Sequence, residues 1–276
     1  MNKNWVLSGF GDEISADLAT QLEVMGENGI SHIEIRMVDG KNILDLTDDE
    51  LDQVKETLEK YNFKVSAIGS PIGKIKMTDS FDEHLERFKR ALYTAKQLNT
   101  KYIRIFSFFM KQEETAEYRE EVIRRLSLFT ELAEQEGIIL LHENEKEIYG
   151  DTAERCLDLL QSVNSPSLRA TFDTANFVQV KDEPFPKGYH LLKDYIEYIH
   201  IKDARLEDGK VMPAGQGDGN FSGLLEQLDL DNFQGFFSFE PHLTSKSEPG
   251  GGEEKFGMAV KAFKDLASNI KTVTLK

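Results

Sequence analysis

Cysteine, positive charge and long apolar runs are scarce in this sequence, and each scarcity excludes a class of protein. The 276 residues include one cysteine, Cys156, so the chain cannot form an internal disulfide. Its place in the helical pattern AERCLDLLQSV predicts a buried apolar role rather than a nucleophilic one. No apolar run is long enough to span a bilayer, so we expect no membrane insertion.

The deficit of positive charge argues against nucleic acid as a partner. Lys and Arg number 33 against 49 Asp and Glu, which gives a formal net charge of -16. Such a surface repels a phosphate backbone unless a local basic cluster overrides it, and the sequence has no cluster of that size. The N-terminal segment MNKNWVLSGFGDE lacks the long apolar stretch and cleavage pattern of a signal peptide. We therefore expect a cytoplasmic protein with a small-molecule partner.

Short apolar segments alternate with amphipathic helical patterns along the whole chain. Eight segments are rich in β-branched and aromatic residues, as buried parallel strands are: 6–11, 32–36, 63–69, 101–109, 138–143, 168–173, 195–201 and 233–240. Helical spacing of apolar residues marks segments such as 16–29, 48–62, 81–99 and 118–137. This alternation predicts an α/β protein, specifically a (β/α)₈ TIM barrel that forms a single domain over residues 1–276.

Local signals agree with this division. Thr47 with Glu50, and Asp151 with Glu154, have the spacing of a capping box at a helix N-terminus. The segment PGGGEEK at 249–255 predicts a flexible loop before the last helix. No linker or change of composition divides the chain, which supports one domain.

Four potential metal ligands end consecutive strand segments in the C-terminal half. The segments IILLHE, LRATFD, YIEYIH and GFFSFE end in Glu143, Asp173, His200 and Glu240, which are 30, 27 and 40 residues apart. In a parallel barrel the ends of the strands converge on one mouth, where catalytic residues lie. Three carboxylates and one imidazole suit a catalytic divalent ion. Taken singly, each acid or histidine has a simpler structural explanation, but four in succession predict one site.

Several segments resemble the xylose isomerase-like barrel superfamily of sugar isomerases, epimerases and dehydratases. The resemblance covers nearly the whole chain and rests on GDEIS, LLHENE, TFDTAN, YIHIKDA, PAGQGDG and FSFEPHL. It implies that one divalent ion is held by Glu143, Asp173, His200 and Glu240. We expect Mn²⁺, with Mg²⁺, Co²⁺ or Zn²⁺ as alternatives. The resemblance also implies that Glu240 exchanges a proton on one face of the substrate and Glu143 on the other.

Further residues are candidates for contact with the substrate. Glu145 shares a face with Glu143 in an extended chain, but Glu143 is nearer the strand and is preferred as the ligand. Lys202 and Arg205 follow His200 and either hold a polar substrate group or are solvated charges. Asn176 stands where many sugar epimerases of this superfamily carry histidine, which puts a standard ketose 3-epimerase in doubt. His242 either joins the site or is a hydrogen-bonded loop residue.

Other features favour structural roles. Arg36 and Arg104 either point to the mouth or pair with Glu34 and other acids, and we favour the structural role for both. His142 should face away from the mouth and pack. The glycine-rich segment 213–223 lacks the position and spacing of a dinucleotide fingerprint and is interpreted as a mobile loop at the rim.

These observations favour a metal-dependent isomerase or epimerase of a small keto-sugar or related polyol. A carboxylate would remove the proton beside the carbonyl, and the metal would stabilise the enediolate. The alternative is a dehydratase of the same superfamily with an inosose-like or dehydroshikimate-like substrate, because its first step is the same. A metal-dependent endonuclease and a non-catalytic binding protein rank lower. Exposed aromatic loops make a homo-oligomer plausible.

Overall fold

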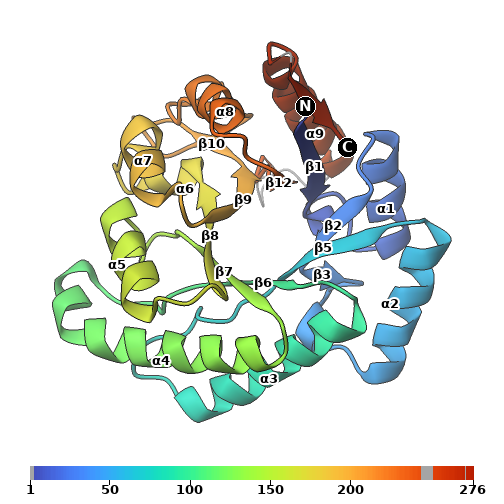
Figure 1. The fold of residues 1–276 in the computed structure, drawn as a ribbon. Helices are drawn as coiled ribbons and strands as arrows, with labels where there is room; N and C mark the ends of the chain where they lie inside the picture. Colours follow the sequence, from blue (N-terminus) through green and yellow to red (C-terminus); the bar gives the residue numbers. More distant parts are fainter. Residues whose placement is uncertain (1–2, 244–250, 271) are drawn as a thin grey trace.

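The fold is a ring of parallel strands covered on the outside by helices (Figure 1). The computed structural model describes residues 3–243, 251–270 and 272–276. The hydrogen-bonded order of the main sheet is β13-β1-β12-β9-β8-β7-β6-β5-β2. Strand β2 also packs beside β1, which brings the two sides of this order together. The predicted TIM barrel is confirmed.

Eight strands form the ring, and each overlaps one of the eight predicted segments. They are β1 (Lys3–Gly9), β2 (His32–Ile35), β5 (Lys64–Gly69), β6 (Tyr102–Ile105), β7 (Ile139–Glu143), β8 (Leu168–Asp173), β9 (Ile196–Ile201) and β12 (Gly235–Phe239). A further strand that we did not predict, β13 (Val273–Leu275), pairs with the start of β1. Two short hairpins, β3 (Met37–Val38) with β4 (Lys41–Asn42) and β10 (Asp203–Ala204) with β11 (Val211–Met212), lie outside the ring.

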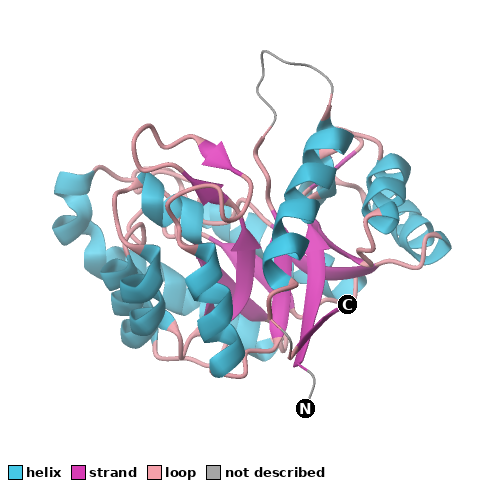
Figure 2. Ribbon diagram, turned by 90° about the horizontal axis from the view of Figure 1, so that it is seen from above, coloured by secondary structure: helices cyan, strands magenta, loops and turns pink. Residues whose placement is uncertain are grey.

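The helices shield the sheet from water, as Figure 2 shows from above. They are α1 (Leu18–Glu27), α2 (Asp48–Lys60), α3 (Phe81–Gln97), α4 (Thr115–Gln135), α5 (Ala153–Val163), α6 (Thr174–Gln179), α7 (Tyr189–Leu192), α8 (Phe221–Leu230) and α9 (Gly252–Ala267). Short irregular turns are η1 (Gly11–Glu13), η2 (Ile43–Asp45), η3 (Gln112–Glu114) and η4 (Pro184–Gly188). Within the described part of the chain, no helix combines the length and apolar character needed to cross a membrane.

Two predicted helix starts can be compared with the structure: one is confirmed, and the other is wrong by one residue. Thr47 and Glu50 form both hydrogen bonds of the capping box at α2. At α5 the prediction was wrong by one residue, because Thr152 is the N-cap and Asp151 binds the guanidinium of Arg155 instead. The side chain of Asp151 is thereby drawn away from the free helix N–H groups.

The glycine-rich segment before the last helix is shorter than we predicted. Residues 249 and 250 of the expected loop lie outside the described residues, but α9 already begins at Gly252. Glu253 and Glu254 occupy its first turn, where negative charge favours a helix N-terminus. The acidic pair therefore starts the helix rather than extending the loop.

Cys156 has the structural role that its pattern predicted. Its side chain is buried in α5, and its thiol donates a hydrogen bond to the carbonyl oxygen of Gly150 over 3.2 Å. Burial raises the pKa of the thiol well above its usual value, so the reactive thiolate is disfavoured.

Candidate metal and substrate site

Four side chains from the ends of consecutive barrel strands meet in one buried cluster. Glu143 ends β7, Asp173 ends β8, His200 lies in β9 and Glu240 directly follows β12. One ligand atom from each of the four lies within 4.8 Å of the others. Atom Nδ1 of His200 is 3.3 Å from Oε1 of Glu143, 3.6 Å from Oδ2 of Asp173 and 3.7 Å from Oε2 of Glu240. We call these residues the four-residue cluster.

Three atoms that face one another in the four-residue cluster form no aligned hydrogen bond with the described residues, although Arg104 lies 3.2 Å from Oε2 of Glu143 and Lys202 lies 2.9 Å from Oδ2 of Asp173. Oε2 of Glu143, Oδ2 of Asp173 and Nδ1 of His200 are buried and form no aligned hydrogen bond with any described residue. Carboxylates that converge in a buried site repel one another and lose their hydration, so they require positive charge nearby. The donor set therefore fits a divalent cation, which would satisfy all of them at once.

The register of β8 and β9 and a local hydrogen bond of Asp173 place the side chains of Asp173 and His200 next to each other. The two residues are direct neighbours in the ladder between β8 and β9. Asp173 is also the N-cap of α6, because its Oδ1 accepts the backbone N–H of Asn176 over 2.9 Å. One oxygen of Asp173 is thus committed to the helix, and Oδ2 is left for the four-residue cluster.

Glu34 orients His200 and was not singled out by the sequence. Its Oε2 is 3.2 Å from Nε2 of His200, and both side chains are fully buried. A hydrogen bond between Nε2 and Glu34 keeps Nδ1 turned towards the cluster, where it can bind an ion once it has lost its proton, and this is the usual way a protein orients a metal-binding imidazole. Although burial opposes the charge, Glu143 and Glu34 raise the pKa of His200 well above its usual value.

Lys202 lies inside the site rather than in solvent. Its ammonium group donates to Oε2 of Glu240 over 2.7 Å and is 2.9 Å from Oδ2 of Asp173. Burial disfavours the charged form, but Asp173 and Glu240 outweigh it and raise the pKa of Lys202 well above its usual value. Lys202 is therefore a cation between two of the four ligands.

Arg104 and Arg36 pair with acids, as in the structural role that we favoured, but these acids lie at the mouth. Arg104 places Nη1 3.2 Å from Oε2 of Glu143, and its guanidinium stacks 5.0 Å from the ring centre of Phe10. Arg36 places Nη1 3.2 Å from Oε1 of Glu240. The reason is charge: buried carboxylates at the strand ends need cations, and arginine can stack on an aromatic ring while pairing.

Asn176 lies beside the four-residue cluster and holds Glu143. Its amide nitrogen donates to Oε1 of Glu143 over 3.1 Å and to the carbonyl oxygen of Asn144 over 2.8 Å. Although burial opposes it, His200 and Arg104 hold the pKa of Glu143 below its usual range. Burial also opposes ionisation of Glu240, but Lys202, His242 and His200 lower its pKa well below the usual value. Both glutamates are carboxylates at neutral pH.

Three other predicted residues lie at different distances from the cluster. Glu145 is at the rim, where Lys74 lies 3.3 Å from its Oε2. His242 places Nε2 3.2 Å from Oε1 of Glu13 and 3.5 Å from Oε1 of Glu240. Arg205 is exposed and pairs with Asp208 in the loop that joins β10 and β11, so the structure does not bring it to the cluster.

Glu13 and His142 differ in how burial affects them. Burial and the charge of Glu240 raise the pKa of Glu13 to about 8. His142 faces away from the cluster, as expected, and its Nε2 is 3.0 Å from the hydroxyl of Ser107. Burial lowers the pKa of His142 to about 4, so this imidazole is neutral at neutral pH.

The glycine-rich rim segment is tied down by Asp203. Its carboxylate accepts the backbone N–H groups of Gly215, Gly217 and Gly219 over 3.0, 3.0 and 2.9 Å. A Cβ at Gly217 would lie 2.4 Å from the carbonyl oxygen of Ala204, so this close approach requires glycine. The amides that a phosphate could use are therefore occupied by Asp203.

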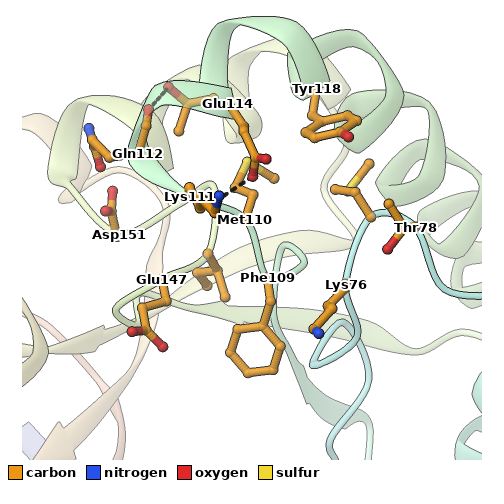
Figure 3. A pocket seen from close by; sticks show the side chains of 13 residues that line it. Lys76, Thr78, Phe109, Met110, Lys111, Gln112, Glu114, Tyr118, Glu147 and Asp151 are labelled. Atoms are coloured by element: carbon orange, nitrogen blue, oxygen red, sulfur yellow. Dashed lines mark hydrogen bonds between the residues drawn. The ribbon is translucent and has the colours of Figure 1, made fainter.

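A separate cavity of about 720 Å³ lies beyond the loops that follow β5, β6 and β7. Figure 3 shows Phe109 and Lys76 on one side of it and Tyr118 of α4 on the other. The four-residue cluster does not contribute to its lining. Its charged lining mixes two lysines, Lys76 and Lys111, with acidic side chains, so charge does not select a class of ligand.

Comparisons with known proteins agree with the fold. The family model described as xylose isomerase-like TIM barrel matches residues 22–265. The chain is similar to 3-dehydroshikimate dehydratase of Bacillus anthracis, with 25% identity over 191 residues, or 66% of this chain and 65% of that protein. It is also 23% identical over 192 residues to the probable L-ribulose-5-phosphate 3-epimerase UlaE of Mycoplasma pneumoniae, covering 67% of this chain and 62% of that protein.

The matched segments thus span a little under two thirds of these two curated relatives. Among solved structures, the IOLI protein with a bound zinc atom superposes with a TM-score of 0.78 at 20% identity, covering 98% of this chain and 99% of that one. The relatives are an epimerase and a dehydratase, and a structural neighbour holds a divalent metal.

Proposed function

The chain belongs to the xylose isomerase-like TIM barrel family, and within it we propose a divalent-metal-dependent isomerase or epimerase of a small keto-sugar or related polyol. The observation that carries the proposal is the buried cluster in which Glu143 and Glu240 stand on either side of His200 and Asp173. Two carboxylates in one dry site can exchange protons with opposite sides of a substrate carbon. Epimerisation uses both carboxylates, and isomerisation uses one.

Glu143, Asp173, His200 and Glu240 would hold the ion, with Mn²⁺ as the first choice and Mg²⁺, Co²⁺ or Zn²⁺ as alternatives. When bound, a divalent ion supplies a Lewis acid that makes the proton beside a carbonyl more acidic. The proposal rests on the convergence of four ligand atoms within 4.8 Å of one another, on Glu34 behind His200 and on the zinc-containing neighbour.

The protein side chains divide the work of proton transfer. Glu240 is ionised because Lys202 lies against one oxygen and Arg36 against the other, so it can accept a proton from the substrate carbon. Glu143 is fixed by Asn176 and Arg104 on the other side of the cluster and serves the opposite face. Asn176, Lys202, Glu145 and His242 are proposed to contact substrate hydroxyl or carbonyl groups, whereas Arg205 would need to move to do so.

A dehydratase is the second candidate, and Lys202 is the observation that favours it. Loss of a hydroxyl group next to the deprotonated carbon requires a proton donor for the leaving oxygen. Lys202 is a buried ammonium 2.7 Å from the proposed base, and it can give that proton. An inosose-like or dehydroshikimate-like substrate fits this step, and one relative is a 3-dehydroshikimate dehydratase.

Exchange of substrate hydrogen with solvent tests both candidates before the final product is known. The Mn²⁺-loaded chain is incubated in heavy water with a panel of keto-sugars, inososes and dehydroshikimate, and the products are identified by mass and NMR. We expect deuterium at the carbon beside the carbonyl of at least one compound. An epimer or aldose identifies the first candidate, and an unsaturated product identifies the second.

Glu240→Gln separates base catalysis from binding. The amide keeps the size of the side chain but cannot accept the proton, so turnover should fall about a hundredfold or more while substrate affinity changes little. Glu226→Gln, an exposed change on α8, is the matched control. If metal-loaded Glu240→Gln exchanges the substrate proton at the wild-type rate, Glu240 is not the base.

A further inference from the structure

Arg104 reaches both glutamates that are proposed to exchange protons with the substrate. It lies in β6, and its Nη1 is 3.2 Å from Oε2 of Glu143 and 3.6 Å from Oε1 of Glu240. Its side chain is 5% exposed, so bulk water reaches little of it. A substrate carbon that gives a proton to one glutamate and takes one from the other lies between them. An oxygen bound next to that carbon therefore comes within reach of Arg104.

The hydrogen-bonding capacity of Arg104 is largely unused. A guanidinium has five N–H groups. Among the described residues, one aligned hydrogen bond engages them, a long one of 3.4 Å from Nη2 to the carbonyl oxygen of Ser70. The buried Nε has no partner in the described part of the chain, and the contact with Oε2 of Glu143 is not aligned as a hydrogen bond. A buried N–H without an acceptor is costly, so the guanidinium fits an oxygen that a ligand supplies.

The other cations at the mouth are committed to carboxylates of the protein. Lys202 donates to Oε2 of Glu240 over 2.7 Å. Arg36 donates to Oδ2 of Asp12 over 2.8 Å and to Oε1 of Glu240 over 3.2 Å. Of these three cations, Arg104 is therefore the one with most N–H groups left for a substrate.

Two aromatic rings hold the guanidinium of Arg104 in place. Its central carbon is 5.0 Å from the ring centre of Phe10 and 4.9 Å from that of Phe106. Gly69, a direct neighbour of Arg104 in the ladder between β5 and β6, makes room for Phe10, because a Cβ there would lie 2.7 Å from its Cε1. Arginine can stack on aromatic rings and still donate from its edge. The site thus contains a positive donor whose position is fixed before a substrate binds.

We propose that Arg104 is a further catalytic residue, which donates hydrogen bonds to the substrate oxygen that becomes negatively charged during proton exchange. One glutamate takes the proton of the C–H bond, and the electron pair of that bond forms a double bond to the carbonyl carbon. The second pair of the carbonyl bond moves to its oxygen, which gives the enediolate. Return of a proton to carbon restores the C–H bond and the carbonyl.

Arg104 transfers no proton in either step and stabilises the oxygen while it is charged. The inference rests on the proposed function, because it concerns the same substrate carbon. The measurements below have outcomes that overturn one and leave the other.

Arg104→Met tests the contact, because it keeps an unbranched stem beside the two rings and removes the charge and the N–H groups. Turnover of the Mn²⁺-loaded variant should fall about 100-fold to 1000-fold, as expected for loss of a donor to an oxyanion. Manganese content at saturating Mn²⁺ should stay at the wild-type level. Arg124→Met, a change of an exposed arginine on α4, is the matched control and should keep wild-type turnover.

Binding of a small mimic of the enediolate gives a readout apart from turnover. Glycolohydroxamate carries the planar oxygens of an enediolate on a two-carbon unit, whereas glycolamide lacks the hydroxamate oxygen. In calorimetric titrations of the Mn²⁺-loaded chains, Arg104→Met should bind glycolohydroxamate about 10-fold to 100-fold more weakly than the wild type. Its affinity for glycolamide should be unchanged. Equal affinity of the two chains for glycolohydroxamate overturns the inference.

The pH profile separates a contact with the substrate from support of Glu143. If Arg104 only keeps Glu143 ionised, Arg104→Met regains wild-type turnover at pH 9, and the inference is overturned. Arg104→Lys keeps the charge and guards against loss of the fold, which circular dichroism checks. Its turnover should stay below that of the wild type at every pH, because the ammonium lacks the planar fork, and wild-type turnover in this variant also overturns the inference.

The two proposals fail separately. A wild-type chain that exchanges no substrate proton with solvent, but binds glycolohydroxamate more tightly than Arg104→Met does, overturns the proposed function and leaves the oxyanion contact. A wild-type chain that exchanges the proton as fast as Arg104→Met does, with the same manganese content, leaves the proposed function and overturns the role of Arg104.

Discussion

The two halves of the barrel contribute different parts of the same site. Strands β7, β8, β9 and β12 carry the four ligand candidates at or just after their ends. Strand β2, the residue that directly follows it and strand β6 instead supply the side chains around them: Glu34 behind His200, Arg36 beside Glu240 and Arg104 beside Glu143. The second half offers the ligand atoms together with Lys202 and Asn176, and the first half adds further groups that orient and neutralise them.

This difference follows from where charge can be tolerated. Three carboxylates in a buried cluster repel one another, and each loses its hydration. The first half of the barrel offsets this with arginines whose guanidinium groups stack on Phe10, at 4.5 Å for Arg36 and 5.0 Å for Arg104. Substitution of a ligand in the second half should therefore abolish binding of the ion, whereas substitutions in the first half should only lower the affinity for it.

The largest effect is expected from His200→Ala. The variant loses the one imidazole of the four-residue cluster, so bound Mn²⁺ at this site and turnover should both fall to background. The fold should persist, because the residue crowns the barrel at its mouth. His32→Ala, at the other end of the barrel on β2, is the matched control. Wild-type metal content in His200→Ala would show that the four-residue cluster does not hold the ion.

A smaller effect is expected from Glu34→Gln. The amide keeps the shape but lacks the charge that favours a proton on Nε2 of His200, so Mn²⁺ affinity should fall about 10-fold to 100-fold. Calorimetric titration of the stripped protein measures it, and unfolding by urea checks the fold. An affinity equal to that of the wild type would mean that Glu34 does not support the imidazole.

The smallest effect concerns His142, a buried histidine on which burial outweighs the charge of the neighbouring Glu143. Its pKa is lowered to about 4 by burial, against about 6.5 in an unfolded chain. The unfolded chain therefore binds the proton more readily, and stability is lost as pH falls from about 6.5 towards 4. Between pH 7 and pH 5 this single group accounts for about 2 kcal/mol of unfolding free energy.

His142→Gln removes that titration and keeps a polar group near Ser107. Urea unfolding at both pH values should show a smaller acid loss in the variant than in the wild type. If the two chains lose the same free energy, proton uptake by His142 does not contribute to the acid sensitivity.

The sequence predicted the barrel and the four ligand candidates for the same reason. A residue such as Asp173, which breaks a run of apolar residues, marks both the end of a strand and the mouth of a parallel barrel. Glu34 and Arg104 gave no such signal, because each stands inside its strand and the pattern does not reveal which face is buried. Strand β13 was missed because three residues are too short for a periodic pattern.

Contacts between distant segments could not be predicted from the sequence for a related reason. Lys202 could equally have been a solvated charge, and its place between Asp173 and Glu240 depends on how β9 and β12 lie in the ring. The rim segment 213–223 was expected to be mobile, but the carboxylate of Asp203 accepts hydrogen bonds from the amides of Gly215, Gly217 and Gly219. Both outcomes depend on side-chain geometry that residue spacing does not encode.

Anomalous diffraction from crystals grown with Mn²⁺ tests the central claim most directly, because it locates the metal without reference to activity. The account predicts an anomalous peak bounded by Glu143, Asp173, His200 and Glu240, with Glu34 still against Nε2 of His200. An active, Mn²⁺-containing protein whose crystals show no peak among these four residues would contradict it.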